Sequence, residues 1–155
     1  MVPKCDVGLK VTSHRLSLLD LAARLERDPQ SGSHDNGSPR GSPRSGLVWD
    51  CTIWRENARD EDATLEVKCK QLLFDMPPKC IELRESYPED ISVYLSIAIF
   101  YTGAYASVTL PRCLIREISN KDIDLDITCY PCCEPDEEIN RGRFGSSDGP
   151  PHKSD

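Results

Sequence analysis

Cysteines near the end of the chain are the residues whose type and spacing first suggest chemistry. The chain has eight cysteines, and Cys129 and Cys132 form a C-x-x-C motif with Cys133 directly after it. Thiols at this spacing serve as a redox pair or as half of a zinc site. A redox pair normally precedes a helix, whereas the acid-rich segment 134–138 follows here and opposes thiolate formation. A zinc site would need a second pair, which is absent, so the thiols are interpreted as structural, with metal binding and redox chemistry as alternatives.

Three aspartates directly before this motif suggest recognition of charge. Asp122, Asp124 and Asp126 alternate with large apolar residues. On a strand, this alternation places the three carboxylates along one face, about 6–7 Å apart. The stripe is either the solvated face of an edge strand or an acidic docking surface for a basic partner. Divalent metal binding is less favoured, because such ions usually take carboxylates that converge from a loop.

Two tryptophans are candidates for an interface anchor. Trp49 and Trp54 have opposite parity, so we expect one of them in the core and the other exposed. An exposed tryptophan anchors interfaces well, while packing under a helix is the alternative. We place Trp54, with the aspartate stripe, in the predicted partner contact.

No motif in the sequence indicates catalysis. The histidines are His14, His34 and His152, and no serine, cysteine or carboxylate pattern around them reads as a nucleophile system. The Gly-Ser-Pro-Arg repeat at 37–44 lacks the lysine and the following helix start of a phosphate-binding loop. The sequence therefore predicts a protein that is not an enzyme and needs no cofactor.

The elements that carry these residues follow from the periods of the apolar residues. Alternation at every second position predicts strands, and spacing by three or four predicts amphipathic helices. Ser17 and Asp20 have capping-box spacing for the first helix, and Pro77–Pro78 ends the second. Strands are expected over 5–11, 47–53, 80–84, 91–101 and 123–127, and helices over 18–25, 65–76 and 110–118.

The order of these elements predicts an α+β fold. Two strand–helix–strand halves, one at each end of the chain, are joined by a linking helix. This pattern is typical of a ferredoxin-like plait with an antiparallel or mixed sheet. The strand over 91–101 is the longest and most apolar, so we expect it at the centre of the sheet.

Two segments differ from the rest in composition. Residues 28–46 are rich in Gly, Ser and Pro and are expected to form a mobile surface loop, because they bury too little apolar surface to offset their chain entropy. Residues 134–155 are expected to form a disordered acidic tail. Residues 1–133 are then expected to form a single α+β domain.

Three segments of the chain resemble parts of one bacterial family. Residues 21–29 resemble its first helix, which runs into a proline, and 47–54 resemble its Trp-bearing strand. Residues 110–130 resemble its last helix and strand. The family is domain of unknown function 4279. This chain departs from the family's pattern at the Gly-Ser-Pro-Arg repeat and at the cysteine-rich end. It implies a small cytosolic α+β domain and no particular reaction.

The charge balance favours a basic partner. Lys and Arg number 19 against 26 Asp and Glu, which gives a formal net charge of −7. Nucleic acid is not expected as a ligand, because an acidic surface repels phosphates. A membrane span is not expected either, because no run approaches the roughly 18 apolar residues that it needs. The N-terminus lacks the basic-then-apolar order of a secretory signal, so we expect a cytoplasmic protein.

Taken together, the sequence favours a non-catalytic protein-binding module. The function expected first is that of an immunity protein that neutralises a cognate bacterial toxin. Many toxins act on nucleic acid and are basic, and charge complementarity speeds their capture. The alternative is a small-ligand- or metal-binding domain that uses the C-terminal cysteine cluster. We expect a basic protein partner, such as a secreted toxin, and a chain that is a monomer or a homodimer.

Overall fold

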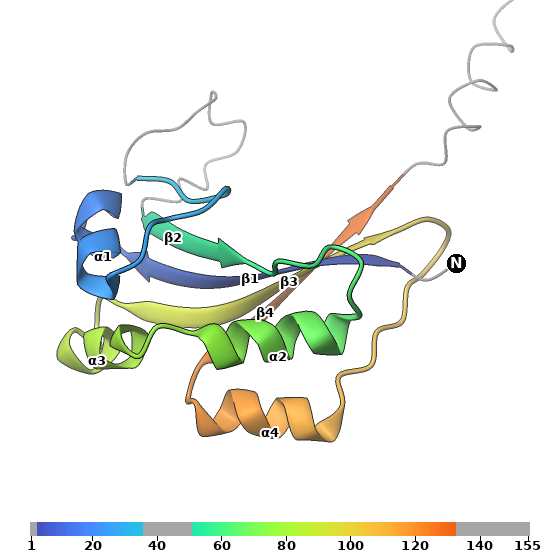
Figure 1. Cartoon of the computed structure of the whole chain (residues 1–155). Coiled ribbons are helices and arrows are strands. Elements are labelled where there is room, and N and C mark those ends of the chain that lie inside the picture. The colour runs from blue at the N-terminus through green and yellow to red at the C-terminus, as the bar shows by residue number, and fades with distance from the viewer. Residues whose placement is uncertain (1–2, 36–50, 133–155) are drawn as a thin grey trace, which may run out of the picture.

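The computed structural model describes residues 3–35 and 51–132, in which four helices pack on a four-stranded mixed sheet (Figure 1). The α+β class expected from the sequence is confirmed. In the part of the chain so described, no helix is both long and apolar enough to cross a bilayer. The strands, in the order β2-β1-β3-β4 across the sheet, are β1 (Lys4–Ser13), β2 (Thr52–Asn57), β3 (Ser92–Tyr101) and β4 (Asp124–Pro131). The helices are α1 (Leu18–Leu25), α2 (Leu65–Asp75), α3 (Lys79–Ser86) and α4 (Arg112–Asn120).

Two strand–helix–strand halves build the sheet, and each keeps its two strands side by side. β1 and β2 pair antiparallel, because α1 and the segment after it return the chain to the end of the sheet that β1 has just reached. β3 and β4 pair in parallel, because α4 carries the chain back to the start of β3. The halves join where β1 pairs antiparallel with β3. The sheet is therefore mixed, and the strand order of a ferredoxin-like plait is not confirmed.

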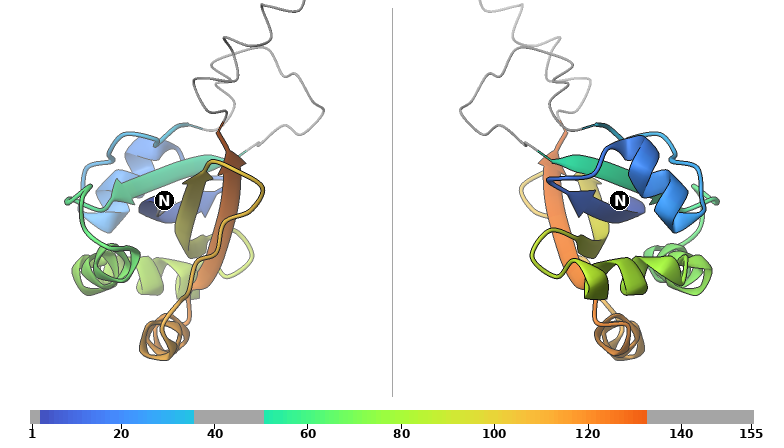
Figure 2. Two further views of the ribbon diagram at one scale, coloured as in Figure 1. Left: turned by 90° about the vertical axis from the view of Figure 1, so that its right-hand side faces the viewer. Right: turned by 90° about the vertical axis from the view of Figure 1, so that its left-hand side faces the viewer.

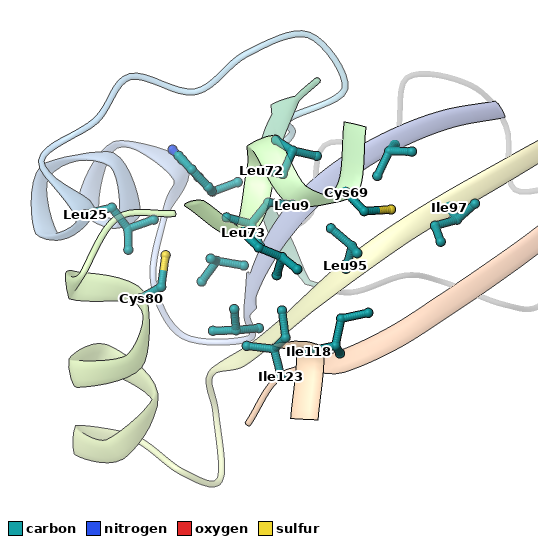
Figure 3. Close-up of a cluster of buried hydrophobic side chains, with 14 of the residues drawn as sticks. Leu9, Leu25, Cys69, Leu72, Leu73, Cys80, Leu95, Ile97, Ile118 and Ile123 are labelled. Atoms are coloured by element: carbon teal, nitrogen blue, oxygen red, sulfur yellow. The ribbon is translucent and has the colours of Figure 1, made fainter. Parts of the chain in front are cut away.

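The core lies between the sheet and the helices, which gather on one side of it (Figure 2). Alternate side chains of β1 and β3 point toward the helices and are buried, as the apolar alternation predicts. β3 lies between two other strands, so its expected interior place in the sheet is confirmed. Core residues from β1, α2, β3 and the end of α4 meet in one cluster (Figure 3).

Local signals in the sequence fix the starts of two helices. Ser17 caps α1, and its Oγ accepts a hydrogen bond from the Asp20 N–H at 3.1 Å, as the capping-box spacing predicts. Thr64 caps α2 in the same way, with Oγ1 3.4 Å from the Val67 nitrogen. On α2, Cys69, Leu72 and Leu73 are the buried apolar residues, at the spacing of a helix. On α1, Leu21 and Leu25 form the buried face, and Leu19 is 79% exposed.

A helix, α3, replaces the short strand expected over 80–84. Cys80 and Leu83 are the buried residues of this segment, and their spacing of three is helical. Pro78 occupies the start of the helix, where its fixed φ suits the first turn. The expected strand is wrong, because five residues are too few to distinguish the period of a strand from that of a helix.

The first part of the expected surface loop runs along the outer edge of β2. His34 N–H donates to the Ile53 carbonyl at 2.9 Å, and Ile53 N–H donates back at 2.8 Å. Gln30 N–H donates to the Arg55 carbonyl at 3.0 Å, so residues 30–34 satisfy this edge of the sheet. The remainder of the loop and the expected tail over 134–155 lie outside the described residues.

Candidate functional site

β4 forms the opposite edge of the sheet, and all eight of its residues are exposed. Its inward backbone groups pair with β3. Among residues 3–35 and 51–132, no backbone group donates to or accepts from its outward N–H and C=O groups. A row of unpaired N–H and C=O groups is a template for a further strand. The two edges of the sheet therefore differ, because only that of β2 is covered by described residues.

The pairing of β4 with β3 gives its two faces different chemistry. Asp124 and Asp126 lie opposite Tyr94 and Ser96, on the sheet face turned away from the helices. The next residues along the strand lie on the helix side, opposite core residues of β3. Despite this position they are 38% and 45% exposed, since α4 packs beside α2 and leaves much of β4 uncovered. These apolar residues are Leu125 and Ile127.

Asp122 does not belong to the acidic stripe, which corrects the sequence expectation. It lies in the turn before β4, with a left-handed φ of 54°. Its carboxylate oxygen is 3.2 Å from Arg84 Nη2, and its carbonyl oxygen accepts a second bond from the same guanidinium. The aspartate alternation continues to position 122, but the strand begins only at Asp124. Asp122 thus ties α3 to the turn and leaves two aspartates on the strand.

Trp54 is buried, so the expectation that it is an exposed partner contact is wrong. Its side chain is 0% exposed and lies on the helix side of β2, opposite Val11. Its Nε1–H donates to the Arg27 carbonyl at 3.1 Å. This bond satisfies the one polar atom of the ring and allows it to lie in the core. Trp49, the other tryptophan, lies outside the described residues.

The outer face of the sheet also carries basic residues that the sequence reasoning missed. Lys10 on β1 pairs in register with Arg55 on β2 and with Tyr94 on β3. Burial and then the nearby Arg55 charge lower the pKa of Lys10, while Asp126 acts in the opposite direction. Burial and then the Asp126 charge raise the pKa of Tyr94. This face is therefore basic over β1 and β2 and acidic at β4, and strand parity was the signal that could have shown it.

The side chain of Arg55 occupies the space that a glycine on the neighbouring strand leaves open. A Cβ added at Gly8 would lie 2.8 Å from Arg55 Nε, so the guanidinium occupies the space that a side chain would fill. Arg55 Nε also donates to the Asn57 side-chain oxygen. The positive charge is fixed over β1 in this way, at a distance of one strand from β3.

The cysteines of the C-x-x-C motif do not converge. Cys129 belongs to β4 and Cys132 follows its end, so a nearly extended chain separates them by about 10 Å and turns them to opposite sides. A disulfide requires Cα atoms closer than about 7 Å. Among the residues that the structure describes, no three His, Cys, Asp or Glu side chains are placed to hold a metal. Cys133 lies outside them.

A serine, a histidine and an aspartate meet after β1, but their arrangement is structural. Ser13 Oγ donates to Asp90 Oδ2 at 2.5 Å, and the His14 backbone N–H donates to Asp90 Oδ1 at 2.8 Å. Ser13 is fully buried and its Oγ accepts the Leu16 N–H at 2.9 Å. A catalytic serine is bonded to the histidine ring instead of directly to the carboxylate. This group therefore fastens the turn between β1 and α1.

Comparison of the chain with protein-family models, curated proteins and solved structures finds no match. The resemblance to the domain of unknown function 4279 family stays a prediction.

Proposed function

We propose that this protein is a non-catalytic protein-binding module that receives a strand of a basic partner along β4. The observation that carries the proposal is the difference between the two sheet edges. Residues 30–34 satisfy the edge of β2, whereas the outward backbone of β4 has no such cover among the described residues. In strand addition, main-chain hydrogen bonds supply affinity and alternate side chains supply specificity.

The side chains of β4 determine which partner fits. Asp124 and Asp126 favour Lys or Arg on one face of an incoming strand, and Leu125 and Ile127 favour apolar residues on the other. A second copy of the chain would bring another net charge of −7 to this edge, so charge complementarity favours a basic partner. The proposed ligand is a strand in which basic and apolar residues alternate.

An immunity protein that neutralises a basic toxin in the cytoplasm is the biological role that we propose for this module. It is supported by the acidic net charge and by the two remaining aspartates of the stripe. Charge of opposite sign raises the association rate with such a partner.

We also propose a relation to the ferredoxin-like plait, because the chain contains two strand–helix–strand halves.

Binding of a synthetic strand tests the proposal directly. The probe is a fluorescent eight-residue peptide of alternating lysine and valine, matched by one of alternating glutamate and valine. Fluorescence anisotropy with the full chain should show binding of the lysine peptide that weakens with salt. The double variant Asp124→Lys/Asp126→Lys should raise the Kd for this peptide by about tenfold, because two attractive pairs become repulsive.

A matched variant separates the site from the overall charge. Glu61→Lys/Asp62→Lys makes the same change in net charge at two exposed acids in the loop before α2. Its Kd should stay within about twofold of the original chain at moderate salt. If both double variants weaken binding equally, or if the glutamate peptide binds as well as the lysine peptide, β4 is not the recognition surface.

A further inference from the structure

A pocket at the end of the sheet is separate from the acidic face of β4. It has a volume of about 460 Å³ and lies where β1 starts, where β3 ends and where the chain leaves β4. This volume is within the range of small-molecule sites. Among the described residues, the aromatic ones that line it are Phe100, Tyr101 and Tyr105, and Pro3 adds a further apolar surface. Phe100 and Tyr101 are neighbours on β3, so their rings point to opposite faces of the sheet.

One ring of this pocket, that of Phe100, is held in place by a neighbouring ring. Phe100 stacks on Tyr130, with ring centroids 5.1 Å apart and planes at 16°. This contact holds Phe100 against β4. Tyr105, in the segment between β3 and α4, also lines the pocket and is 83% exposed.

The charge of the pocket selects the ligand further. Lys4 is the only charged side chain among the described residues that line it. Lys4 pairs in register with Phe100, so its ammonium group and this ring belong to neighbouring positions of β1 and β3. The other polar residues of the lining carry hydroxyl groups or a thiol, and they are Tyr101, Thr102, Tyr105, Ser107 and Cys132. A carboxylate or sulfonate on an aromatic ring would satisfy both the ammonium group and the aromatic walls.

We infer that this pocket is a binding site for a small planar aromatic anion. The site is independent of the strand-binding function proposed for β4, because none of its lining residues belongs to the acidic stripe. The Cys132 thiol also lines the pocket, which brings one residue of the C-terminal cysteine cluster to it.

Two fluorescent probes that differ in charge test this inference. The anion is 1-anilinonaphthalene-8-sulfonate, and N-phenyl-1-naphthylamine is its analogue without the sulfonate. Titration of the full chain should show the anion bound more tightly. Tyr105→Ala should weaken both probes, the anion by about tenfold, because the ring wall is lost. Lys4→Ala should weaken the anion alone, by about threefold, because only the sulfonate faces the ammonium group.

Phe74→Ala is the matched control, since Phe74 is an aromatic residue on α2 that is 88% exposed and does not line the pocket. It should leave both affinities unchanged, and thermal unfolding should show all three variants folded. The inference is overturned if Tyr105→Ala has no effect, if Phe74→Ala has the same effect, or if Lys4→Ala changes both probes equally or neither. Peptide binding at β4 is measured with other variants, so the two proposals fail independently.

Discussion

At the scale of single residues, several polar groups of this fold hold segments of the chain together. Asp90 shows this most clearly, because it accepts hydrogen bonds from Ser13 and from the backbone of His14. Burial alone would raise the pKa of Asp90, but these bonds, together with the nearby Arg15 and His14 charges, outweigh it and lower the pKa below the ordinary value of 3.8. The ionised carboxylate therefore stabilises the folded chain.

Replacing Asp90 should cost stability in a pH-dependent way. At neutral pH, Asp90→Ala should lower the free energy of unfolding by about 1–3 kcal/mol, because Ser13 and His14 lose their acceptor. The contribution is present above the unfolded pKa and is lost as the pH falls through the lowered folded pKa. Urea unfolding of both chains at a series of pH values checks this. A difference that stays constant well below pH 3.8 would show that the carboxylate charge has no such role.

Burial also determines what the cysteines and the tryptophan do. It raises the pKa of both Cys69 and Cys80 to about 12, so these thiols act as apolar core residues. Among the described cysteines, only Cys51, Cys69 and Cys80 are buried, whereas Cys113, Cys129 and Cys132 are exposed. The sequence did not indicate the burial of Trp54, because parity assigns residues to two faces without saying which face the helices cover.

At the scale of elements, β3 and β4 present the same residue types on the same side with very different burial. Ile97 and Ile127 are register partners on the helix side of the sheet. Ile97 is 1% exposed and Ile127 is 45% exposed. The contrast arises because β3 lies under the helices, whereas β4 is an edge that α4 does not cover.

This pair provides a matched test of the edge. Ile97→Ala should lower the free energy of unfolding by about 2–5 kcal/mol, as expected for a core cavity. Ile127→Ala should lower it by less than about 1 kcal/mol, because little buried contact is lost. Chemical denaturation of the two variants checks the prediction. Similar losses in both would mean that the inner face of β4 is packed and is not available to a partner.

Elements with several agreeing signals were predictable from the sequence. The first helix had a capping residue and the second a long apolar stripe, and both appear as expected. The segment over 80–84 had only a short alternation, and it forms part of α3 instead. From the sequence, Asp122 is expected in the aspartate stripe, although this residue lies in the turn before β4. The turn places Asp122 beside Arg84, and a contact between residues 38 positions apart cannot be seen in a local pattern.

At the scale of the whole molecule, the sequence predicted the faces of the strands but not their neighbours. Apolar alternation reports which side chains are buried together, whereas strand order depends on long-range pairings such as that of β1 with β3. The same limit applied to the candidate site. The two aspartates of β4 were found, but their basic counterparts Lys10 and Arg55 lie on strands distant in sequence.

The uneven protection of the two sheet edges is the basis of the functional proposal. Charged side chains on an exposed edge strand commonly prevent unwanted pairing with other chains, and the aspartates of β4 can act in this way. The same charges also select a basic strand over an acidic one, since like charges placed opposite each other are unfavourable. Strand addition and simple charge attraction differ in what happens to the outward N–H groups of β4. Strand addition gives them hydrogen bonds to the partner, whereas charge attraction leaves them without such bonds.

Hydrogen–deuterium exchange of the full chain, with and without the lysine–valine peptide, measures those amides most directly. Strand addition predicts that segment 124–131 exchanges more slowly when the peptide is bound, while segment 52–57 of β2 is unchanged. Binding that leaves 124–131 unprotected, or that protects 52–57 instead, would contradict the proposal that β4 receives the partner.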